Sequence, residues 1–503
     1  MDVASGLIQG FSVALAPGNL MWCFVGCFLG TVVGIMPGLG PAATIAMLLP
    51  LTFKMDPTSA IIMLAGIYYG AKYGGSTTSI LLNVPGESAS VVTCLDGYQM
   101  ARKGRAGAAL GIAAIASFVA GTVGVIALML ISPPLAKVAL SFSSPEYFAL
   151  MALGLAMVVL LAGRSLVKAL MAMLVGLWIA SIGTDLFTAV SRFTFGQSEL
   201  LDGVDFVIVA IGVFAVGEVL GNMEQREAAQ VLPVPKGLRN LLPTLEELKA
   251  CRFAFLNGSV VGFLIGVLPG AGSTIASFIS YGLEKAVSKH PEKFGTGVPE
   301  GVAAPEGANN SETGGALVPM LTLGIPGSST TAILLAALIL WGLKPGPLMI
   351  QDNPALFWGL VASMYVGNVM LLVLNIPLIP LFAQILRLPV ELLYPLIFGI
   401  SIVGVYSVSG SLFDVWMLAA FGLLGYVMRR LDYPSAPLIL GLVLGDSMER
   451  ALRQSLMMSQ GELGILVSRP VSAIMLGLTV LILLLPLFRK ANAWRVRALE
   501  ENG

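Results

Sequence analysis

Long apolar runs separated by short polar segments dominate this chain. Most of the runs have about the 20 residues, or more, that a helix needs to cross the hydrocarbon core of a bilayer. Eight runs are clear: Ala106–Ile131, Pro145–Ala162, Leu166–Ile182, Phe206–Asn222, Ala355–Ile385, Pro389–Val408, Leu412–Met428 and Pro470–Phe488. Five more are punctuated by glycine, proline or polar residues: Leu20–Phe53, Ala60–Asn83, Phe253–Tyr281, Gly315–Trp341 and Pro434–Gly445. The pattern predicts an all-α polytopic membrane protein with about 11–13 transmembrane helices or half-helices.

Basic residues gather on one side of this predicted topology. Arg102, Lys103 and Arg105 precede a long span, and an even number of crossings later the polar loop 223–252 carries five further basic residues. The opposing loop, 184–205, carries four acidic residues and a single arginine. Because Lys and Arg are retained in cytoplasmic loops, the basic side, with the C-terminal tail, is predicted to be cytoplasmic.

The two halves of the chain repeat each other. Residues 26–40 read GCFLGTVVGIMPGLG and residues 258–272 read GSVVGFLIGVLPGAG, with six identities at an offset of 232. Residues 83–90 (NVPGESAS) parallel residues 324–331 (GIPGSSTT) at an offset of 241. Each half therefore contains two apolar segments broken at a Pro-Gly pair, and such corresponding breaks point to the binding site of a transporter.

This repeat organises the predicted domains. Residues 1–222 form an N-terminal repeat with scaffold helices, 223–252 a cytoplasmic connecting loop, 253–488 the C-terminal repeat and 489–503 a cytoplasmic tail. An odd number of crossings between the copies predicts inverted topology, with the breaks forming re-entrant hairpins. The glycines spaced by four residues before the first break of each copy predict close helix packing.

The first break of each copy offers backbone groups to a ligand. Proline removes a donor and glycine permits unusual backbone geometry, so each tract ends one helix and opens another within the membrane. The new helix N-terminus suits a carboxylate, and the carbonyls of the preceding helix end suit Na⁺. A structural kink is the alternative. The candidate substrate-binding residues here are Gly38, Gly40, Gly270, Gly272, Ser273 and Thr274.

The second break of each copy adds side-chain oxygens. Asn, Ser and Thr can hydrogen-bond an oxyanion or coordinate a cation, although capping of a helix is the simpler role for Ser and Thr. The substrate-binding candidates are Asn83, Gly86, Ser88, Gly327, Ser328 and Ser329. Candidate neighbours of a bound Na⁺ are Pro37, Pro269, Ser76, Thr77 and Thr330.

Charges inside apolar segments are costly and are therefore functional candidates. Besides Lys72 they include Glu87, Asp96, Glu218 and Asp414, of which Glu218 is expected to lie at the membrane interface. Lys72 lies within YYGAKYGG, where it could attract an anionic substrate, extend to the membrane surface or pair with an acid. Glu300, Glu306 and Glu312 belong to a Gly-rich polar stretch that we expect to be a loop into the site or a solvated connection.

Composition narrows the class of protein. The 503 residues include 28 Lys+Arg and 28 Asp+Glu, and this 11% of charged residues cannot solvate the surface of a soluble enzyme. Zero net charge without basic blocks argues against nucleic-acid binding. One histidine and four cysteines leave little for a metal centre. No cofactor is expected, apart from Na⁺ as a possible coupling ion.

An enzyme is disfavoured by the motifs as well. Gly445-Asp446 with Asp414 faintly resembles intramembrane aspartyl proteases, but the order of the motif is wrong. The chain also has no Gly-x-x-x-x-Gly-Lys-[Ser/Thr] sequence with which to hydrolyse ATP.

Three segments make the sequence similar to a known family. The GxxxGxxPGxG tract, YYGAKYGGSTTSILLNVPGE and PEGVAAPEGANNSETGGALVPMLTLGIPGSSTTAILL resemble the large membrane subunit of the tripartite tricarboxylate transporters, over nearly the whole chain. The family's motif positions fall on Gly38, Gly40, Pro85, Gly86, Gly270, Gly272, Pro326 and Gly327.

The resemblance implies a multi-pass secondary transporter of the bacterial cytoplasmic (inner) membrane. Its expected partners are a small four-helix membrane subunit, a periplasmic solute-binding protein, a carboxylate substrate and the lipid bilayer. The resulting hypothesis is import of tri- or dicarboxylates by Na⁺ or H⁺ symport, with elevator-like alternating access by analogy. A passive channel or a structural membrane scaffold is the alternative.

Overall fold

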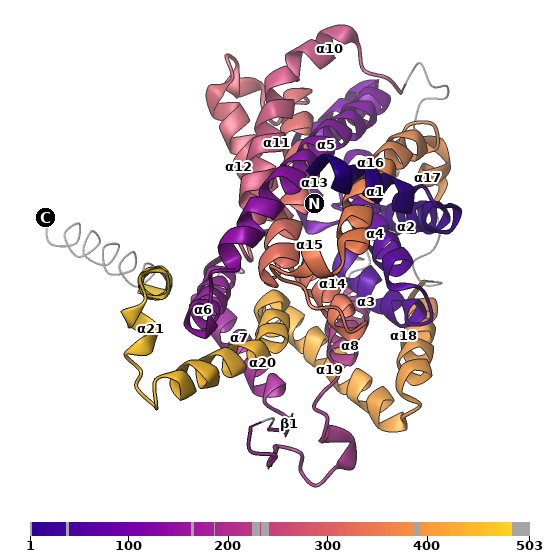
Figure 1. The fold of residues 1–503 in the computed structure, drawn as a ribbon. Helices are drawn as coiled ribbons and strands as arrows, with labels where there is room; N and C mark the ends of the chain where they lie inside the picture. Colours follow the sequence, from indigo (N-terminus) through magenta and orange to yellow (C-terminus); the bar gives the residue numbers. More distant parts are fainter. Residues whose placement is uncertain are drawn as a thin grey trace, which may run out of the picture. The chain divides into compact units, whose positions relative to one another are not determined.

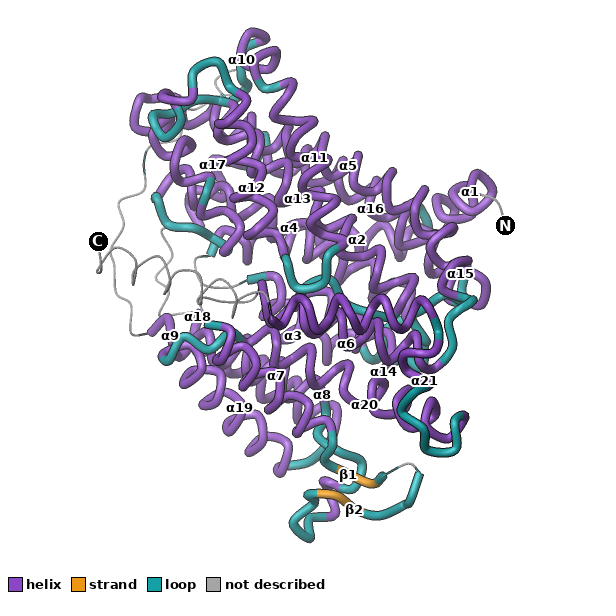
Figure 2. The backbone as a smooth tube through the Cα atoms, turned by 90° about the vertical axis from the view of Figure 1, so that its left-hand side faces the viewer, coloured by secondary structure: helices purple, strands orange, loops and turns teal. Residues whose placement is uncertain are grey.

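A computed structural model describes residues 3–36, 40–161, 165–185, 187–223, 232, 241–385 and 393–484. The described chain is largely helical, with a two-stranded hairpin (Figures 1 and 2). It divides into two compact units. The all-α class predicted from the apolar runs is confirmed. The connecting loop, except residues 223, 232 and 241–252, and the whole tail 489–503 lie outside the described residues.

The larger unit comprises residues 1–139 and 205–430. Its helices up to residue 223 are α1 (Val3–Ala14), α2 (Pro17–Ile35), α3 (Pro41–Thr52), α4 (Pro57–Leu82), η1 (Ser88–Val91), η2 (Cys94–Tyr98), η3 (Ala101–Arg105), α5 (Ala106–Ala139), α8 (Phe206–Ala210), η5 (Ile211–Val216) and α9 (Gly217–Met223). Those that follow are α10 (Leu245–Ala250), α11 (Arg252–Val267), α12 (Gly272–Val287), η7 (Pro291–Lys293), α13 (Glu300–Leu323), α14 (Ser329–Leu340), α15 (Met349–Asp352), α16 (Pro354–Asn375), α17 (Ile379–Ile385), α18 (Leu393–Ser409) and α19 (Leu412–Arg430).

The smaller unit comprises residues 140–204 and 431–503. Its described elements are α6 (Ser144–Leu161), α7 (Leu166–Ala180), β1 (Gly183–Thr184), β2 (Ser191–Arg192), η4 (Ser198–Leu200), α20 (Ser435–Met458), α21 (Ile465–Ser468) and a helix over Pro470–Leu484. Within this unit α20 packs on α6 and α7, and Gly176 lies against the backbone of Leu438.

An ionic network holds the hairpin of the smaller unit. The Asp185 carboxylate lies 2.9 Å from Arg453, and Arg192 lies 2.8 Å from Glu449. Hydrogen bonds from the backbone N–H groups of Phe187 and Thr188, helped by Arg453, hold the pKa of Asp185 below its usual range. Asp185, which the sequence offered only as part of an acidic loop, is thus a structural anchor.

The described residues contain five helices that are long and apolar enough to cross a membrane, judged by length and composition. They span Pro17–Ile35, Ala101–Ala139, Phe206–Met223, Pro354–Asn375 and Leu412–Arg430, and shorter apolar helices accompany them. The number of crossings and the orientation of the repeats stay predictions.

Two long helices, α4 and α13, lie at the centre of the larger unit. Asp56 caps α4 by accepting hydrogen bonds from the N–H groups of Thr58 and Ser59, and every residue from Ala60 to Leu81 is buried. The helix ends at Asn83, whose φ of 58° is left-handed. α13 is buried from Gly301 to Thr322 and ends at Gly324 with a φ of 70°.

The expectation that the stretch around Glu300, Glu306 and Glu312 is a loop or a solvated connection is wrong. These residues belong to α13, one continuous helix of 24 residues. Its glycines and polar side chains suggested a loop because no apolar stripe marks the helix. Burial on every side removes the need for such a stripe, since α13 packs on α11, α5, α12 and α4.

Glycines bring each central helix against its partner. A Cβ added at Gly26, Gly30 or Gly34 of α2 would lie 2.2–2.4 Å from the carbonyl oxygen of Met63, Ile67 or Ala71 of α4. In the second copy Gly258, Gly262 and Gly266 of α11 meet the carbonyls of Ala304, Ala308 and Glu312 of α13, at 2.4–2.8 Å. The close packing expected at these glycines is confirmed.

The two helix pairs are equivalent. Each of these three glycine–carbonyl contacts maps from the first copy to the second by adding 232 to the α2 residue and 241 to the α4 residue. The sequence offsets therefore describe a repeat of three-dimensional structure, in which Lys72 corresponds to Thr313 and Tyr68 to Asn309.

Candidate functional site at the paired helix breaks

The first break separates α2 from α3 and α11 from α12, as the Pro-Gly tracts predicted. In the first copy Gly40 precedes α3, whereas Pro37 and Gly38 lie outside the described residues. In the second copy Gly270 and Gly272 have φ values of 81° and 64°, which favour glycine. The N–H of Gly270 donates to the carbonyl of Gly327 over 2.8 Å, so the first break is tied to the second.

The second break is built alike in both copies. Glu87 forms a capping box with Ser90 at the start of η1, and Ser328 forms one with Thr331 at the start of α14. These pairs are related by the offset of 241. Helix capping, the alternative considered for these hydroxyls, is therefore one of their roles.

Glycine packing at the second break is also repeated. Gly86 lies against the carbonyl of Gly34 and the backbone of Gly75, and Gly327 lies against the carbonyl of Gly266 and the backbone of Ala316. Because a Cβ would come within 3 Å of these backbone atoms, both positions need glycine.

The two copies contact each other reciprocally. The Tyr68 hydroxyl lies 3.4 Å from Ser328 Oγ, and Asn309 Nδ2 donates to Glu87 Oε1 over 2.7 Å. Tyr68 corresponds to Asn309 and Glu87 to Ser328, so each copy's central helix touches the other copy's second break. Whole elements follow the same rule, since α12 packs on η1 and α3 packs on α14. Reciprocal contacts of this kind are what an approximate two-fold axis produces.

Lys72 lies where the copies meet. Its Nζ is 3.6 Å from Glu87 Oε2 and 3.8 Å from Glu312 Oε2, and the side chains of all three are at most 4% exposed. The ammonium also donates to the Ser273 hydroxyl. Of the alternatives open from the sequence, pairing with an acid is the one observed, and Lys72 has two carboxylate partners.

Glu306 is a third buried carboxylate, six residues before Glu312 on α13 and so nearly two helical turns away. It is 0% exposed, and it accepts hydrogen bonds from the hydroxyls of Ser76 on α4 and Thr93 beside η2. Among the described residues no basic group lies within ion-pair distance of it. Lys72 is thus one buried cation among three buried carboxyl groups, so the cluster favours cations when those groups are ionised.

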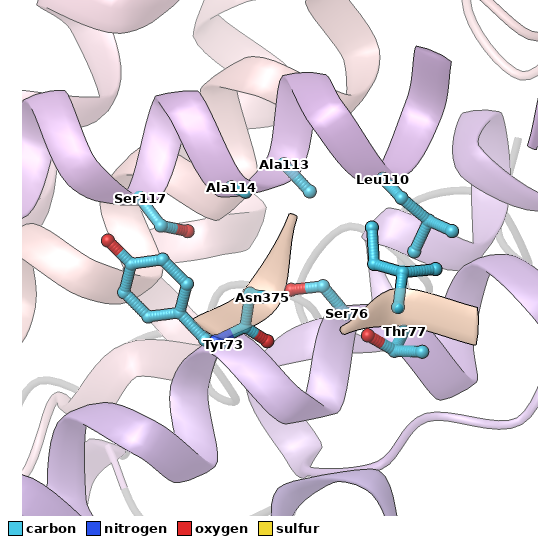
Figure 3. Close-up of a pocket in the computed structure, with 9 residues that line it drawn as sticks. Tyr73, Ser76, Thr77, Leu110, Ala113, Ala114, Ser117 and Asn375 are labelled. Atoms are coloured by element: carbon cyan, nitrogen blue, oxygen red, sulfur yellow. The ribbon is translucent and has the colours of Figure 1, made fainter. Parts of the chain in front are cut away.

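A small polar pocket adjoins this cluster. Tyr73, Ser76 and Thr77 of α4 face Ser117 of α5 and Asn375 of α16 across it (Figure 3). Tyr73 donates to Asn368 over 2.7 Å, so the polar side chains continue from the cluster into α16. Thr77, a predicted neighbour of Na⁺, lines this pocket rather than the cluster around Lys72.

The structure brings two predicted site residues of the second copy, Ser273 and Thr274, against predicted residues of the first. Thr274 donates to Ser88 over 3.0 Å, beside the contact between Lys72 and Ser273. The other candidates lie at element ends. Asn83 is exposed at the end of α4, Gly40 precedes α3, Ser329 and Thr330 begin α14, and Pro269 lies between α11 and α12.

Residues outside the predicted substrate-binding set complete the cluster: Tyr68, Glu87, Glu306, Asn309 and Glu312. Of these, the three glutamates had been considered only as charges within or between apolar segments. A signal for part of this set was present in the sequence. Glu306, Asn309, Asn310 and Thr313 are spaced i, i+3, i+4 and i+7, which places them along one face of a helix. The expectation of a loop concealed this pattern.

Comparison with known proteins agrees with this architecture. A model of the tripartite tricarboxylate transporter TctA family matches residues 20–440. The chain belongs to this family. The family is one of membrane transporters rather than enzymes, and the chain is accordingly a multi-pass membrane transporter subunit.

Two curated relatives come from Agrobacterium vitis. The chain is 48% identical over 492 residues to an uncharacterised 52.8 kDa protein of the TAR-I ttuC′ 3′ region, covering 97% of this chain and 98% of the relative. It is 43% identical over 241 residues to an uncharacterised protein of the TAR-II ttuC′ 3′ region, covering 48% of this chain and 100% of that relative.

Proposed function

We propose that this chain is the permease subunit of a binding-protein-dependent secondary transporter that imports tri- or dicarboxylates by cation symport. The observation that supports this most directly is the meeting of duplicated helix breaks at one buried cluster of charged residues. In transporters with internal repeats the substrate and coupling ions bind at such breaks. Family membership supports the expected small four-helix membrane subunit, the periplasmic binding protein and the location in the bacterial inner membrane.

The breaks supply groups that suit a carboxylate. Ser273 lies in the first turn of α12 beside Lys72, and Ser328 caps α14 beside Tyr68, so both breaks of the second copy place a hydroxyl and a helix N-terminus near the cluster. Helix N-termini favour anions through unpaired N–H groups and the dipole. Lys72 supplies the positive charge, but it is shared with two carboxylates. A substrate anion therefore gains from a cation that enters with it.

The same geometry suits alternating access. All described breaks lie in the larger compact unit, so that this unit could carry the site as one body. The reciprocal contacts are consistent with copies inverted about an axis in the membrane plane. We propose elevator-like movement of this unit on that basis.

Uptake into vesicles tests the proposal. The chain is reconstituted with its small membrane subunit, the binding protein is added outside, and uptake of radiolabelled citrate and other carboxylates is measured with and without a Na⁺ or pH gradient. We expect concentrative, saturable uptake that collapses with the gradient. Flux that is neither concentrative nor saturable would instead support the passive channel, and no flux would support the scaffold.

Two variants locate the binding groups. Ser273→Ala and Ser328→Ala remove hydroxyls from the cluster and are expected to raise KM about tenfold, the equivalent of about 1.4 kcal/mol. Ser363→Ala is the matched control, because the Ser363 hydroxyl is buried and bonded to the carbonyl of Leu360 in its own helix. Equal effects of all three substitutions would contradict a direct role of the breaks.

A further inference from the structure

Helix α13 contains three buried oxygen atoms that no hydrogen-bond donor among the described residues reaches. They are Asn309 Oδ1, Glu312 Oε1 and Thr313 Oγ1. All three residues are 0% exposed. An unpaired buried polar atom costs about 1–3 kcal/mol, and more when it is charged. Three in five consecutive residues therefore indicate a missing ligand.

The three side chains share one face of the helix. Spacings of i, i+3 and i+4 place them as neighbours around one turn. Asn309 donates to Glu87, and Glu312 Oε2 accepts from the Tyr68 hydroxyl over 3.2 Å. This face of α13 is therefore turned towards α4 and η1, where the two copies meet.

The repeat explains why a cation is missing at this place. Thr313 corresponds to Lys72 by the offset of 241. In the first copy the Lys72 ammonium is a cation attached to the chain, and it lies between two carboxylates. In the second copy a hydroxyl occupies the same position and brings no charge. Glu312 shares the Lys72 ammonium through Oε2, whereas its Oε1 has no partner among the described residues.

The donor set selects the kind of cation. A carboxylate, an amide carbonyl and a hydroxyl are hard oxygen ligands, which suit alkali and alkaline-earth ions. A proton on Glu312 Oε1 would make that oxygen a donor to a single acceptor, so that Asn309 Oδ1 and Thr313 Oγ1 could not both be satisfied by it. A single carboxylate among the three ligands favours a monovalent ion over a divalent one.

We propose that Asn309 Oδ1, Glu312 Oε1 and Thr313 Oγ1 bind Na⁺ as the coupling ion. This assignment rests on the proposed function, which requires a coupling cation without naming its site. The bound Na⁺ reduces the negative charge of the cluster and so prepares it for the substrate carboxylate. Water or the substrate completes the coordination shell.

Binding of Na⁺ is measured on the purified full-length chain by thermal unfolding. NaCl is titrated at constant ionic strength against choline chloride, with KCl as a parallel series. A ligand that binds only the folded state raises the Tm, so we expect a Na⁺-specific rise in the wild type. Thr313→Val should raise the half-saturating Na⁺ concentration at least tenfold, and Thr313→Ser should restore it.

The control is Thr322→Val, in the same helix. Thr322 is equally buried, but its hydroxyl donates to the carbonyl of Val318 within α13. This variant should keep the wild-type half-saturating concentration. The proposal is overturned if the wild type shows no Na⁺-specific rise, or if Thr313→Val keeps the wild-type value.

Vesicle uptake separates this proposal from the proposed function. Concentrative carboxylate uptake that follows a pH gradient and ignores Na⁺ would refute the Na⁺ site and leave the symporter intact. Absence of concentrative uptake, together with normal Na⁺-dependent stabilisation, would refute the symporter and leave the ion site intact. Na⁺-driven uptake that Thr313→Val weakens and Thr322→Val preserves supports both.

Discussion

Replacing Lys72 by methionine removes the only basic side chain that the described residues contribute to the cluster. The substitution keeps most of the volume of the aliphatic stem. It leaves Glu87 and Glu312, whose oxygens lie 3.6 and 3.8 Å from Nζ, without their cation. Breaking a buried pair on one side costs about 3–5 kcal/mol, because a charge stays buried and uncompensated.

A second substitution tests whether this loss is electrostatic. In Lys72→Met/Glu312→Gln one of the uncompensated charges is gone, while the amide can still accept a hydrogen bond from Tyr68. We expect the double variant to be more stable than Lys72→Met by at least about 1 kcal/mol, within the 0.5–3 kcal/mol typical of coupled neighbours. Glu87 remains charged, so recovery should be partial.

The assay is the unfolding free energy of the purified protein in mixed micelles, measured for the wild type, both single variants and the double variant. Lys137→Met is the control, because Lys137 is exposed on α5 and should change stability by no more than about 0.5 kcal/mol. The reasoning fails if Lys72→Met is as mild as the control, or if the effects of Lys72→Met and Glu312→Gln simply add.

Three further predictions concern packing and anchoring. In Gly262→Ala the new Cβ would lie 2.4 Å from the Ala308 carbonyl oxygen. We expect this clash to lower the free energy of unfolding by about 1–3 kcal/mol, of which the better helix propensity of alanine returns about 1 kcal/mol. Gly282→Ala, with nothing within 4 Å, should be neutral or stabilising in the same unfolding assay, and equal effects would contradict the packing argument. The Asp96 carboxylate accepts hydrogen bonds from three backbone N–H groups of the loop 295–298 and so holds this loop in place. Asp96→Asn should therefore speed amide hydrogen exchange in the loop, and unchanged exchange would contradict this role of Asp96. The lowered pKa of Asp185 means that its contribution to stability is complete above its unfolded pKa, about 3.9, and is lost as the pH falls through the lower folded value. ¹³C-NMR titration should show that pKa rising in Arg453→Met, and no rise would rule out the ion pair as a cause.

Much of the fold follows from local sequence. Proline and glycine act on their own backbone, so the breaks before α3 and α12 and after α4 and α13 could be located in advance. The glycines spaced by four residues in α2 and α11 likewise predicted close helix packing, because the absence of a Cβ is a local property. The stretch that became α13 was misjudged, since its polar composition is also typical of a loop.

The candidate site could be predicted only in part. The hydroxyls and glycines at the breaks were found from their repetition, and Lys72 was found because a charge in an apolar segment is rare. Its pairing with Glu87 and Glu312 was not found, because these residues lie 15 and 240 positions away along the chain. No local pattern links an ammonium to carboxylates at such separations.

By itself, the sequence determined that the chain is helical, apolar, duplicated and broken at corresponding points, since hydropathy, proline and glycine act on the segment that contains them. Only the tertiary structure decided which charged side chains meet. It also decided that Tyr68 and Asn309 contact the opposite copy and that a polar stretch forms a central helix. The physical reason is burial. A buried charge or oxygen is tolerated when another segment supplies its partner, and that partner is chosen by packing in three dimensions.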